Sequence, residues 1–333
     1  MWWMLLGCPS SVDVPKSPAS DASDAQQEPI DPFRGLSVHL SIDDLPFQIQ
    51  RGQQMTLTRE ETAAWNERLR RHLATHRAPA SVFFVCDWLH EGSSEVEDWA
   101  SAGHAVGNHT AHHLAARTVG PEAFLADAEA CQERLAADGH PGRWFRYPYL
   151  SHGADPSSQQ AIREGLGALG LSNVPIAAPT TEWVFAFRYR LALEAGDADE
   201  ARLVAAAYLE HMDDALLHAE ALAQRTVGRT APHTVLVHAN ELNGDWLDDL
   251  LGRWSRRGVR FVGVDEVMAD SLYQRPILGT SAGALPWTLR VIDEPVSDAL
   301  RWFDQEEGRV RSAWPLPPEP WPTGVPVSAS LSE

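Results

Sequence analysis

Two histidines four residues apart offer the first ligands for a metal ion. His109 and His113 occur in the segment His-Thr-Ala-His-His, and this spacing predicts that both imidazoles lie on one face of a helical turn. Two such nitrogens and one carboxylate make a hydrolytic zinc site with an open coordination position. A zinc peptidase of the H-E-x-x-H type would carry Glu where this chain has Thr110. We therefore expect the general base to come from another segment, unless the pair is a chance spacing among the 14 histidines of the chain.

Adjacent carboxylates are the candidates for the third ligand and the base. Asp43 and Asp44 directly follow the apolar run 36–42. Neighbouring residues of a strand point to opposite faces, so both carboxylates can serve one site only if the chain turns there. An isolated Asp-Asp pair is also typical of a turn or a helix cap.

Two further polar side chains follow apolar runs. Arg146 lies in the segment Phe-Arg-Tyr-Pro-Tyr, and His238 comes directly after the run 234–237. The end of a buried strand is a typical position for a catalytic acid or base. The alternatives are a surface ion pair for Arg146 and a hydrogen-bonded core histidine for His238.

Strands and helices must alternate to bring these residues together. Short apolar runs predict strands at 36–42, 81–86, 105–107, 144–146, 234–237 and 260–264, and helical periodicity marks 58–76, 121–138, 156–166 and 241–256. Such alternation indicates parallel strands joined by crossover helices, closed as a barrel or left open. Catalytic groups then gather at the C-terminal ends of the strands. A helical block at 183–228 interrupts the pattern and is interpreted as an insertion.

Five motifs, taken in order, resemble those of the polysaccharide deacetylase family, the NodB-homology fold also called carbohydrate esterase family 4. They are Asp43-Asp44, His109 to His113, Arg146-Tyr147-Pro148-Tyr149, Glu182-Trp183 and Leu236-Val237-His238. The resemblance covers residues 34–275 and implies an α/β fold, a distorted (β/α) barrel with a helical insertion and an irregular C-terminal tail. The segment Ser-Ile-Asp-Asp-Leu-Pro looks most like a bacterial branch of that family.

The resemblance also implies a metal centre. Asp44, His109 and His113 would ligate a divalent metal, most often Zn2+, with Co2+, Ni2+ or Mn2+ as alternatives. Asp43 would take the proton of the attacking water, and Arg146 would hold that carboxylate ionised and oriented.

The other implied roles concern the substrate and the leaving group. The backbone N–H of Tyr149 would stabilise the oxyanion, and His238 would protonate the departing amine or alcohol. Leu236 and Trp183 would line the substrate pocket. Glu182 would tune His238, but the family usually has Asp there and a further Asp where this chain has Pro179.

Composition narrows the range of functions. The chain has 333 residues, 27 Lys plus Arg and 46 Asp plus Glu, so its net charge is −19, and Lys16 is its single lysine. Schiff-base chemistry and a phosphate-binding GxxxxGK[ST] loop both need a lysine inside a folded site. The single lysine of this chain lies in its N-terminal tail, so both are excluded. The acidic balance argues against nucleic acid as a partner. The chain has 13 tryptophans. Their rings could stack on the apolar faces of sugar rings, or they could simply fill the hydrophobic core.

The two ends of the chain differ from the middle. Residues 1–8 end in Leu-Gly-Cys and resemble a lipoprotein signal without its basic region, 9–33 have the composition of a disordered acidic linker, and 276–333 form a Pro-rich extension. We expect an exported protein of the cell envelope, lipid-anchored through Cys8 or else periplasmic or secreted, with no transmembrane segment. Cys8, Cys86 and Cys131 show no metal or disulfide spacing.

The resemblance to the polysaccharide deacetylase family implies a hydrolase of linear amides that removes acetyl groups from an N-acetylated or O-acetylated glycan. Candidate substrates are chitin oligosaccharide, peptidoglycan, poly-N-acetylglucosamine and xylan. The alternatives are a deacylase of a non-sugar amide and a glycan-binding module with weak or no catalysis. A serine hydrolase is suggested by the G-x-S-x-G pattern at 279–283, but no histidine follows His238 to complete its triad.

Overall fold

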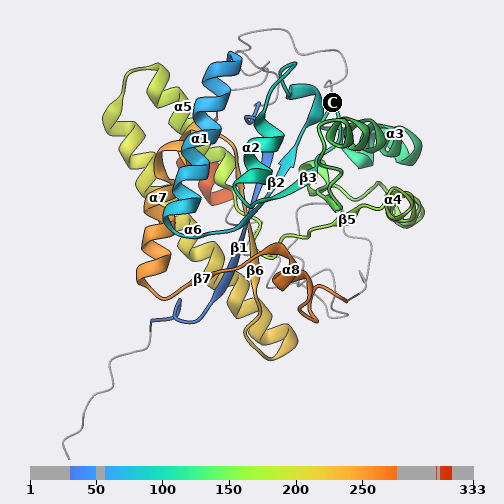
Figure 1. Ribbon diagram of the computed structural model, residues 1–333. Coiled ribbons are helices and arrows are strands. Elements are labelled where there is room, and N and C mark those ends of the chain that lie inside the picture. Colours follow the sequence, from blue (N-terminus) through green and yellow to red (C-terminus); the bar gives the residue numbers. More distant parts are fainter. Residues whose placement is uncertain (1–30, 50–56, 276–304, 306–307, 317–333) are drawn as a thin grey trace, which may run out of the picture. The chain divides into compact units, whose positions relative to one another are not determined.

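A parallel β-sheet forms the centre of the fold (Figure 1). The computed structural model describes residues 31–49, 57–275, 305 and 308–316. Within them the sheet has seven strands in the order β5-β4-β3-β2-β1-β6, with β7 paired to β1, and every pairing is parallel. The strands are β1 Ser37–Leu45, β2 Ala80–Phe84, β3 Ala105–Asn108, β4 Trp144–Phe145, β5 Ser172–Asn173, β6 His233–His238 and β7 Arg260–Phe261. The predicted α/β class is confirmed.

The segment 172–178 joins the two edges of this sheet. At one edge β5 pairs with β4, and a few residues later Ala178 forms a parallel bridge with Val235 of β6 at the other edge. The backbone N–H groups of Ala177 and Ala178 donate to the carbonyl of Thr234 at 3.1 and 3.0 Å. The sheet therefore curls round into a distorted barrel, as the motifs implied.

Helices connect the strands and lie on either side of the sheet. Figure 1 shows α1, α5, α6 and α7 grouped on one side, and α3 and α4 together on the other. The helices are α1 Arg59–Thr75, α2 Glu95–Ser101, α3 Ala116–Ala137, α4 Pro156–Ala168, α5 Glu182–Glu194, α6 Ala198–Val227, α7 Glu241–Arg256 and α8 Val264–Met268, with short 3-10 turns η1 Cys86–Trp88 and η2 Pro148–Leu150. Helices α5 and α6 form the helical insertion between β5 and β6.

Local sequence signals explain where two of these helices begin. Before α1, the hydroxyl of Thr58 accepts the backbone N–H of Glu61 at 3.2 Å, and the Glu61 carboxylate accepts the N–H of Thr58 at 2.8 Å. This capping box satisfies two N–H groups that have no partner inside the helix. In α3 the helical conformation breaks at Gly120, whose φ is 79°. Helical backbone resumes at Pro121, where periodicity predicted the start.

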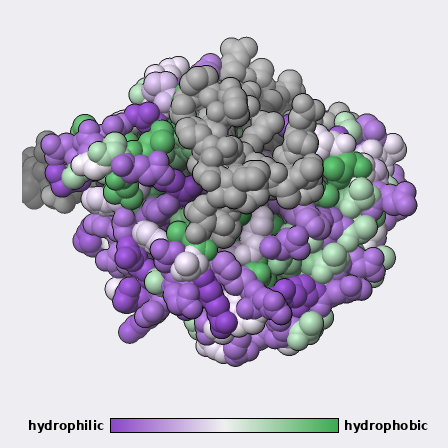
Figure 2. All heavy atoms as spheres, turned by 90° about the horizontal axis from the view of Figure 1, so that it is seen from above, coloured by the Kyte–Doolittle hydropathy of each residue, from purple (hydrophilic) through white to green (hydrophobic). Residues whose placement is uncertain are grey.

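The core lies between the sheet and the helices that cover it. Strand β1 is buried along almost its whole length, and Trp99 and Trp254 are completely buried among the core side chains. These two tryptophans therefore act as core residues. Figure 2 shows hydrophilic residues over most of the visible described surface, with hydrophobic residues in separate patches.

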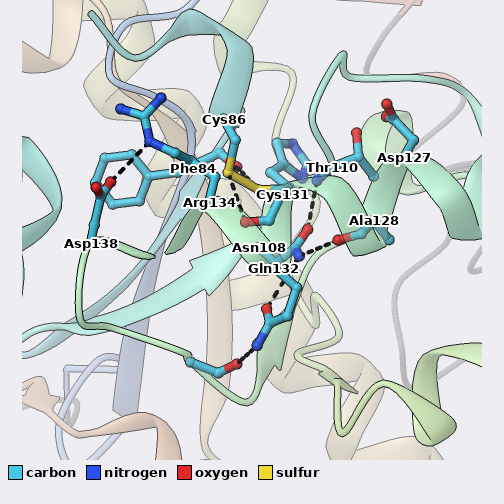
Figure 3. Close-up of a disulfide and its surroundings, with 12 residues drawn as sticks. Phe84, Cys86, Asn108, Thr110, Asp127, Ala128, Cys131, Gln132, Arg134 and Asp138 are labelled. Carbon is cyan, nitrogen blue, oxygen red and sulfur yellow. Dashed lines mark hydrogen bonds and ion pairs between the residues drawn. A yellow bond between two sulfur atoms is a disulfide. The ribbon is translucent and has the colours of Figure 1, made fainter. Parts of the chain in front are cut away.

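Cys86 and Cys131 form a disulfide, which corrects the expectation that the cysteines are unpatterned (Figure 3). Cys86 begins η1 after β2, and Cys131 lies in α3. Their Cα atoms are 5.2 Å apart although they are separated by 45 positions in the sequence. The pairing could not be recognised from spacing, because it depends on α3 packing against the end of β2.

Several predicted segments lie outside the described residues. They are the signal-like residues 1–8, nearly all of the linker 9–33, the pattern at 279–283 and most of the extension 276–333. Part of that extension differs from the irregular tail that was expected, because residues 308–313 are helical. There Val310 is buried and Trp314 packs against the main core. No helix among the described residues is long and apolar enough to cross a membrane.

Candidate metal centre and catalytic residues

The adjacent carboxylates Asp43 and Asp44 lie at the C-terminal end of β1. The register between β1 and β2 shifts between Ile42 and Leu45, and Asp44 has a φ of 62°, a left-handed conformation that interrupts the alternation of a strand. Both side chains therefore approach His109, Asp44 Oδ1 at 3.3 Å and Asp43 Oδ2 at 3.9 Å from its Nε2. This is the turn that the sequence required.

The two histidines are presented by an irregular loop between β3 and α3, so the predicted helical turn is wrong. Thr110 and His113 have φ values of 65° and 59°, which no helical turn contains. The side chain of Asn108 accepts the N–H of Thr110 at 2.8 Å, and the Thr110 hydroxyl accepts the N–H of His113 at 3.0 Å. These local bonds fold the loop back, and the imidazole centroids of His109 and His113 lie 4.8 Å apart.

The loop is fastened to α3 and to the end of β2. Asn108 donates to the carbonyl of Ala128 in α3 at 2.8 Å (Figure 3). Asp127 in the same helix accepts the backbone N–H of His112 at 3.1 Å. On the other side, the N–H of Cys86 donates to the Thr110 carbonyl at 3.1 Å. The Cys86–Cys131 disulfide joins these two supports.

Asp44, His109 and His113 offer one ligand atom each, and these atoms lie within 4.8 Å of one another. Asp44 Oδ1 is 3.3 Å from His109 Nε2 and 3.2 Å from His113 Nε2. The Nδ1–H of His109 donates to the backbone carbonyl of Arg146 at 2.9 Å, which leaves Nε2 to face the site. All three side chains are buried. One carboxylate oxygen and two imidazole nitrogens are a donor set that fits a divalent metal such as zinc.

The protonation of two of these ligands also fits a metal. Burial raises the pKa of Asp44, but His113 and His109 beside it bring that pKa well below its usual value. Burial lowers the pKa of His113, although the charge of Asp44 opposes the shift. Near neutral pH the carboxylate is therefore ionised and the imidazole of His113 is neutral, which are the forms that bind metal ions.

Asp43 sits beside the ligand cluster in contact with a buried arginine. The Arg146 side chain is completely buried, and its Nε lies 3.3 Å from Asp43 Oδ2. Arg146 also donates to the hydroxyl of Ser41 at 2.5 Å, and that hydroxyl donates to Asp43 Oδ1 at 3.5 Å. The ion pair and the hydroxyl fix the orientation of the Asp43 carboxylate.

His238 approaches from β6, where it is the register partner of Asp43. Its Nδ1–H donates to Glu182 Oε2 at 2.6 Å, and Glu182 is completely buried. Burial by itself lowers the pKa of His238, but the charge and hydrogen bond of Glu182 outweigh it and raise the pKa to about 9. Glu182, which stands where the family resembled by the motifs usually has Asp, thus forms a hydrogen bond with His238.

Three further predicted residues are Tyr149, Leu236 and Trp183. The half-exposed ring of Tyr149, with a φ of 56°, lies 4.5 Å from the His113 ring between centroids. Leu236 is buried two residues before His238 on β6. Trp183 follows Glu182 in α5, packs against the main core and lies under the Arg311 guanidinium at 4.9 Å. The roles of Tyr149, Leu236 and Trp183 stay predictions.

Five residues in contact with the site were not predicted, and they are Ser41, Gln48, Tyr208, Asn240 and Asn243. The two asparagines had a local signal, since Asn240 caps α7 and accepts the N–H of Asn243 at 3.0 Å. Gln48 and Tyr208 had none, because only the tertiary fold brings the loop after β1 and helix α6 to this network.

The folded chain is similar to solved carbohydrate esterases. A family 4 carbohydrate esterase from Streptomyces lividans has 16% identity and a TM-score of 0.46, over 68% of this chain and 92% of that chain. A chitin deacetylase from Colletotrichum lindemuthianum has 20% identity and a TM-score of 0.46, over 71% and 88%. A family 4 pseudoenzyme from Bacillus anthracis has 16% identity and a TM-score of 0.46, over 71% and 66%. No curated protein sequence matches this chain.

The family comparison agrees with the motifs in the first half of the chain. Residues 32–169 match the model of the family described as polysaccharide deacetylase. The matched segment contains Asp43, Asp44, His109, His113 and Arg146, and it ends before Glu182 and His238. Over residues 32–169 the chain therefore matches the polysaccharide deacetylase family, in agreement with the ordered motifs.

Proposed function

We propose that this protein is a metal-dependent hydrolase that removes acetyl groups from an N-acetylated or O-acetylated polysaccharide. The observation that carries the proposal is the convergence of Asp44, His109 and His113 beside Asp43 and His238. A metal ligand set, a carboxylate base and a histidine acid are the groups that hydrolysis of an amide or ester requires.

Each side chain of the site has a task in such a reaction. A bound divalent metal, which we propose to be Zn2+, would supply an acidified water and polarise the acetyl carbonyl. Asp43 accepts the proton of the attacking water, and Arg146 orients that carboxylate through their ion pair. His238, protonated at neutral pH because its pKa is raised to about 9, gives its proton to the departing amine or alcohol. The N–H of Tyr149 is assigned to the oxyanion.

The proposed substrate is an acetylated glycan. Leu236 and Trp183 are assigned to the walls of the pocket, and the net charge of −19 favours a neutral glycan such as a chitin oligosaccharide over an anionic one. Peptidoglycan, poly-N-acetylglucosamine and acetylated xylan are the other candidates. A non-sugar amide would use the same chemistry. A glycan-binding module without catalysis is less favoured, because the chain retains Asp44, His109 and His113 as a possible metal-holding group.

We also propose that the protein is exported to the cell envelope, with Cys8 as a candidate lipid attachment site. The disulfide between Cys86 and Cys131 supports this, because disulfides persist mainly in oxidising compartments.

Metal content and acetate release test the function together. Purified protein is analysed for bound metals and incubated with chitin oligosaccharide, peptidoglycan, poly-N-acetylglucosamine and acetylated xylan. We expect about one equivalent of metal and acetate release from at least one glycan, and loss of both in His109→Ala. His140→Ala, which removes a histidine paired with Glu97 away from the site, is the matched control. Full metal occupancy in His109→Ala would overturn the ligand assignment, and acetate release at the parental rate without metal would overturn the chemistry.

A further inference from the structure

A continuous line of hydrogen bonds runs from the metal ligand Asp44 to the acid His238. Gln48 Nε2 donates to Asp44 Oδ2 at 3.2 Å, and Asn240 Nδ2 donates to Gln48 Oε1 at 3.1 Å. The same Asn240 amide donates to Glu182 Oε1 at 2.6 Å, and Glu182 Oε2 accepts from His238 at 2.6 Å. All the intermediate side chains are buried. The base Asp43 takes no part in this line.

The direction of each amide in this line is determined by the start of α7. Asn240 Oδ1 accepts the backbone N–H of Asn243 as the helix cap, so its amino group must face Glu182 and Gln48. Gln48 must then present its oxygen to Asn240 and its amino group to Asp44. On the far side, the hydroxyl of Tyr208 donates to Asn243 Oδ1 at 2.7 Å, and Asn243 Nδ2 donates to Glu182 Oε1 at 2.7 Å. No donor faces a donor along the line.

Gln48 acts on one particular oxygen of Asp44. Asp44 Oδ1 is the atom near His109 and His113, whereas Oδ2 takes the hydrogen bond from Gln48. A bond to the outer oxygen prevents the carboxylate from rotating and leaves Oδ1 for the metal. The backbone of Gln48 is held as well, because its N–H donates to the carbonyl of Ala239 at 2.6 Å.

We propose that Gln48 is a positioning residue that couples the metal ligands to the general acid. Its amide selects Asp44 Oδ1 as the oxygen that faces the metal, and through Asn240 it sets the distance between the metal ligands and His238. This inference rests on the function proposed above. A loss of Gln48 therefore weakens metal binding and slows turnover together, although Gln48 itself contacts neither the metal nor the substrate.

The test replaces Gln48 by residues that cannot form hydrogen bonds to both Asp44 and Asn240. Gln48→Met keeps the size and loses both hydrogen bonds, and Gln48→Asn is too short to span Asp44 and Asn240. For each we expect the Kd for Co2+, titrated by absorbance on metal-free protein, to rise by roughly 10-fold. We expect kcat to fall by a similar factor while KM changes less than twofold. Gln160→Met, the same change on the exposed face of α4, should leave all three values unchanged.

A double substitution tests the coupling itself. Asn240→Ser keeps an oxygen that caps α7 and removes the amide bonds to Gln48 and Glu182. In that background Gln48→Met should lower kcat by a smaller factor than in the parent, because the two residues act through one network. The inference would be overturned if Gln48→Met lowered kcat by the same factor in both backgrounds. It would also be overturned if both Gln48 variants kept a Kd and a kcat within twofold of the parent. Either result would leave the proposed function intact. A parent protein that binds no Co2+ and releases no acetate would instead overturn the proposed function, and this inference with it.

Discussion

Glu182 Oε2 lies 2.6 Å from Nδ1 of His238, although the two residues are separated by 56 positions in the sequence. Glu182 begins helix α5 of the helical insertion, and His238 ends strand β6. The buried glutamate accepts two further hydrogen bonds, from Asn240 and Asn243. The insertion therefore contributes directly to the candidate site, through the residue that raises the pKa of His238.

The charge of His238 predicts a basic limit to activity. Its folded pKa is raised to about 9, so the protonated form is complete below pH 7 and is lost as the pH rises through about 9. We expect kcat/KM to fall with a midpoint near that pH. In Glu182→Gln the attraction is removed while burial remains, so the midpoint should move down by at least one unit. The measurement is kcat/KM between pH 5 and 10.5, and an unmoved midpoint would show that Glu182 does not set this pKa.

Asp43 should be separable from the metal ligands by a single substitution. Asp43→Asn removes the base but leaves Asp44, His109 and His113 in place. We expect bound metal to be retained and kcat to fall by about 10²- to 10⁴-fold. Asp199→Asn, at an exposed carboxylate of α6, is the control. Acetate release at the parental rate from Asp43→Asn would remove this residue from its role.

Removal of the metal should destabilise the protein as well as inactivate it. The three proposed ligands come from the end of β1 and from the loop after β3, so a bound ion would cross-link two segments of the folded state. Metal at 100 times its Kd stabilises a protein by about 2.7 kcal/mol. Dialysis against a chelator should lower the unfolding midpoint and abolish acetate release, and added Zn2+ should restore both. In His109→Ala the added ion should restore neither.

The disulfide should contribute stability and support the histidine loop. Replacing Cys86 and Cys131 together by serine removes a cross-link that spans 45 positions, and we expect a loss of about 2–4 kcal/mol in the free energy of unfolding. The Kd for metal should rise too, because the cross-link holds Cys86 against α3, and the backbone N–H of Cys86 bonds Thr110 between His109 and His113. Urea unfolding and Co2+ titration measure the two effects, with Cys8→Ser as the matched control. Equal stability of the control and the double variant would contradict the prediction.

Local signals in the sequence were enough for much of the fold. Some signals depend only on residues close to one another, such as the cap at Thr58, the break before Pro121 and the apolar runs. The helices and strands that these signals mark could therefore be predicted within a few positions. Strand β5 and helices α2 and α8 were missed. Strand β5 has only two residues, and it is a strand because β4 lies beside it.

The sequence by itself determined which residue types stand at the ends of the strands, and so the ordered motifs Asp43-Asp44, His109 to His113, Arg146 and His238. Only the tertiary structure decided how they meet. Left-handed backbone at Asp44 and His113 interrupts the regular strand and loop conformation. The disulfide and the line from Asp44 through Gln48 to Glu182 join residues far apart in the chain. Distances between such residues depend on how the helices pack on the sheet, and no spacing in one segment records that.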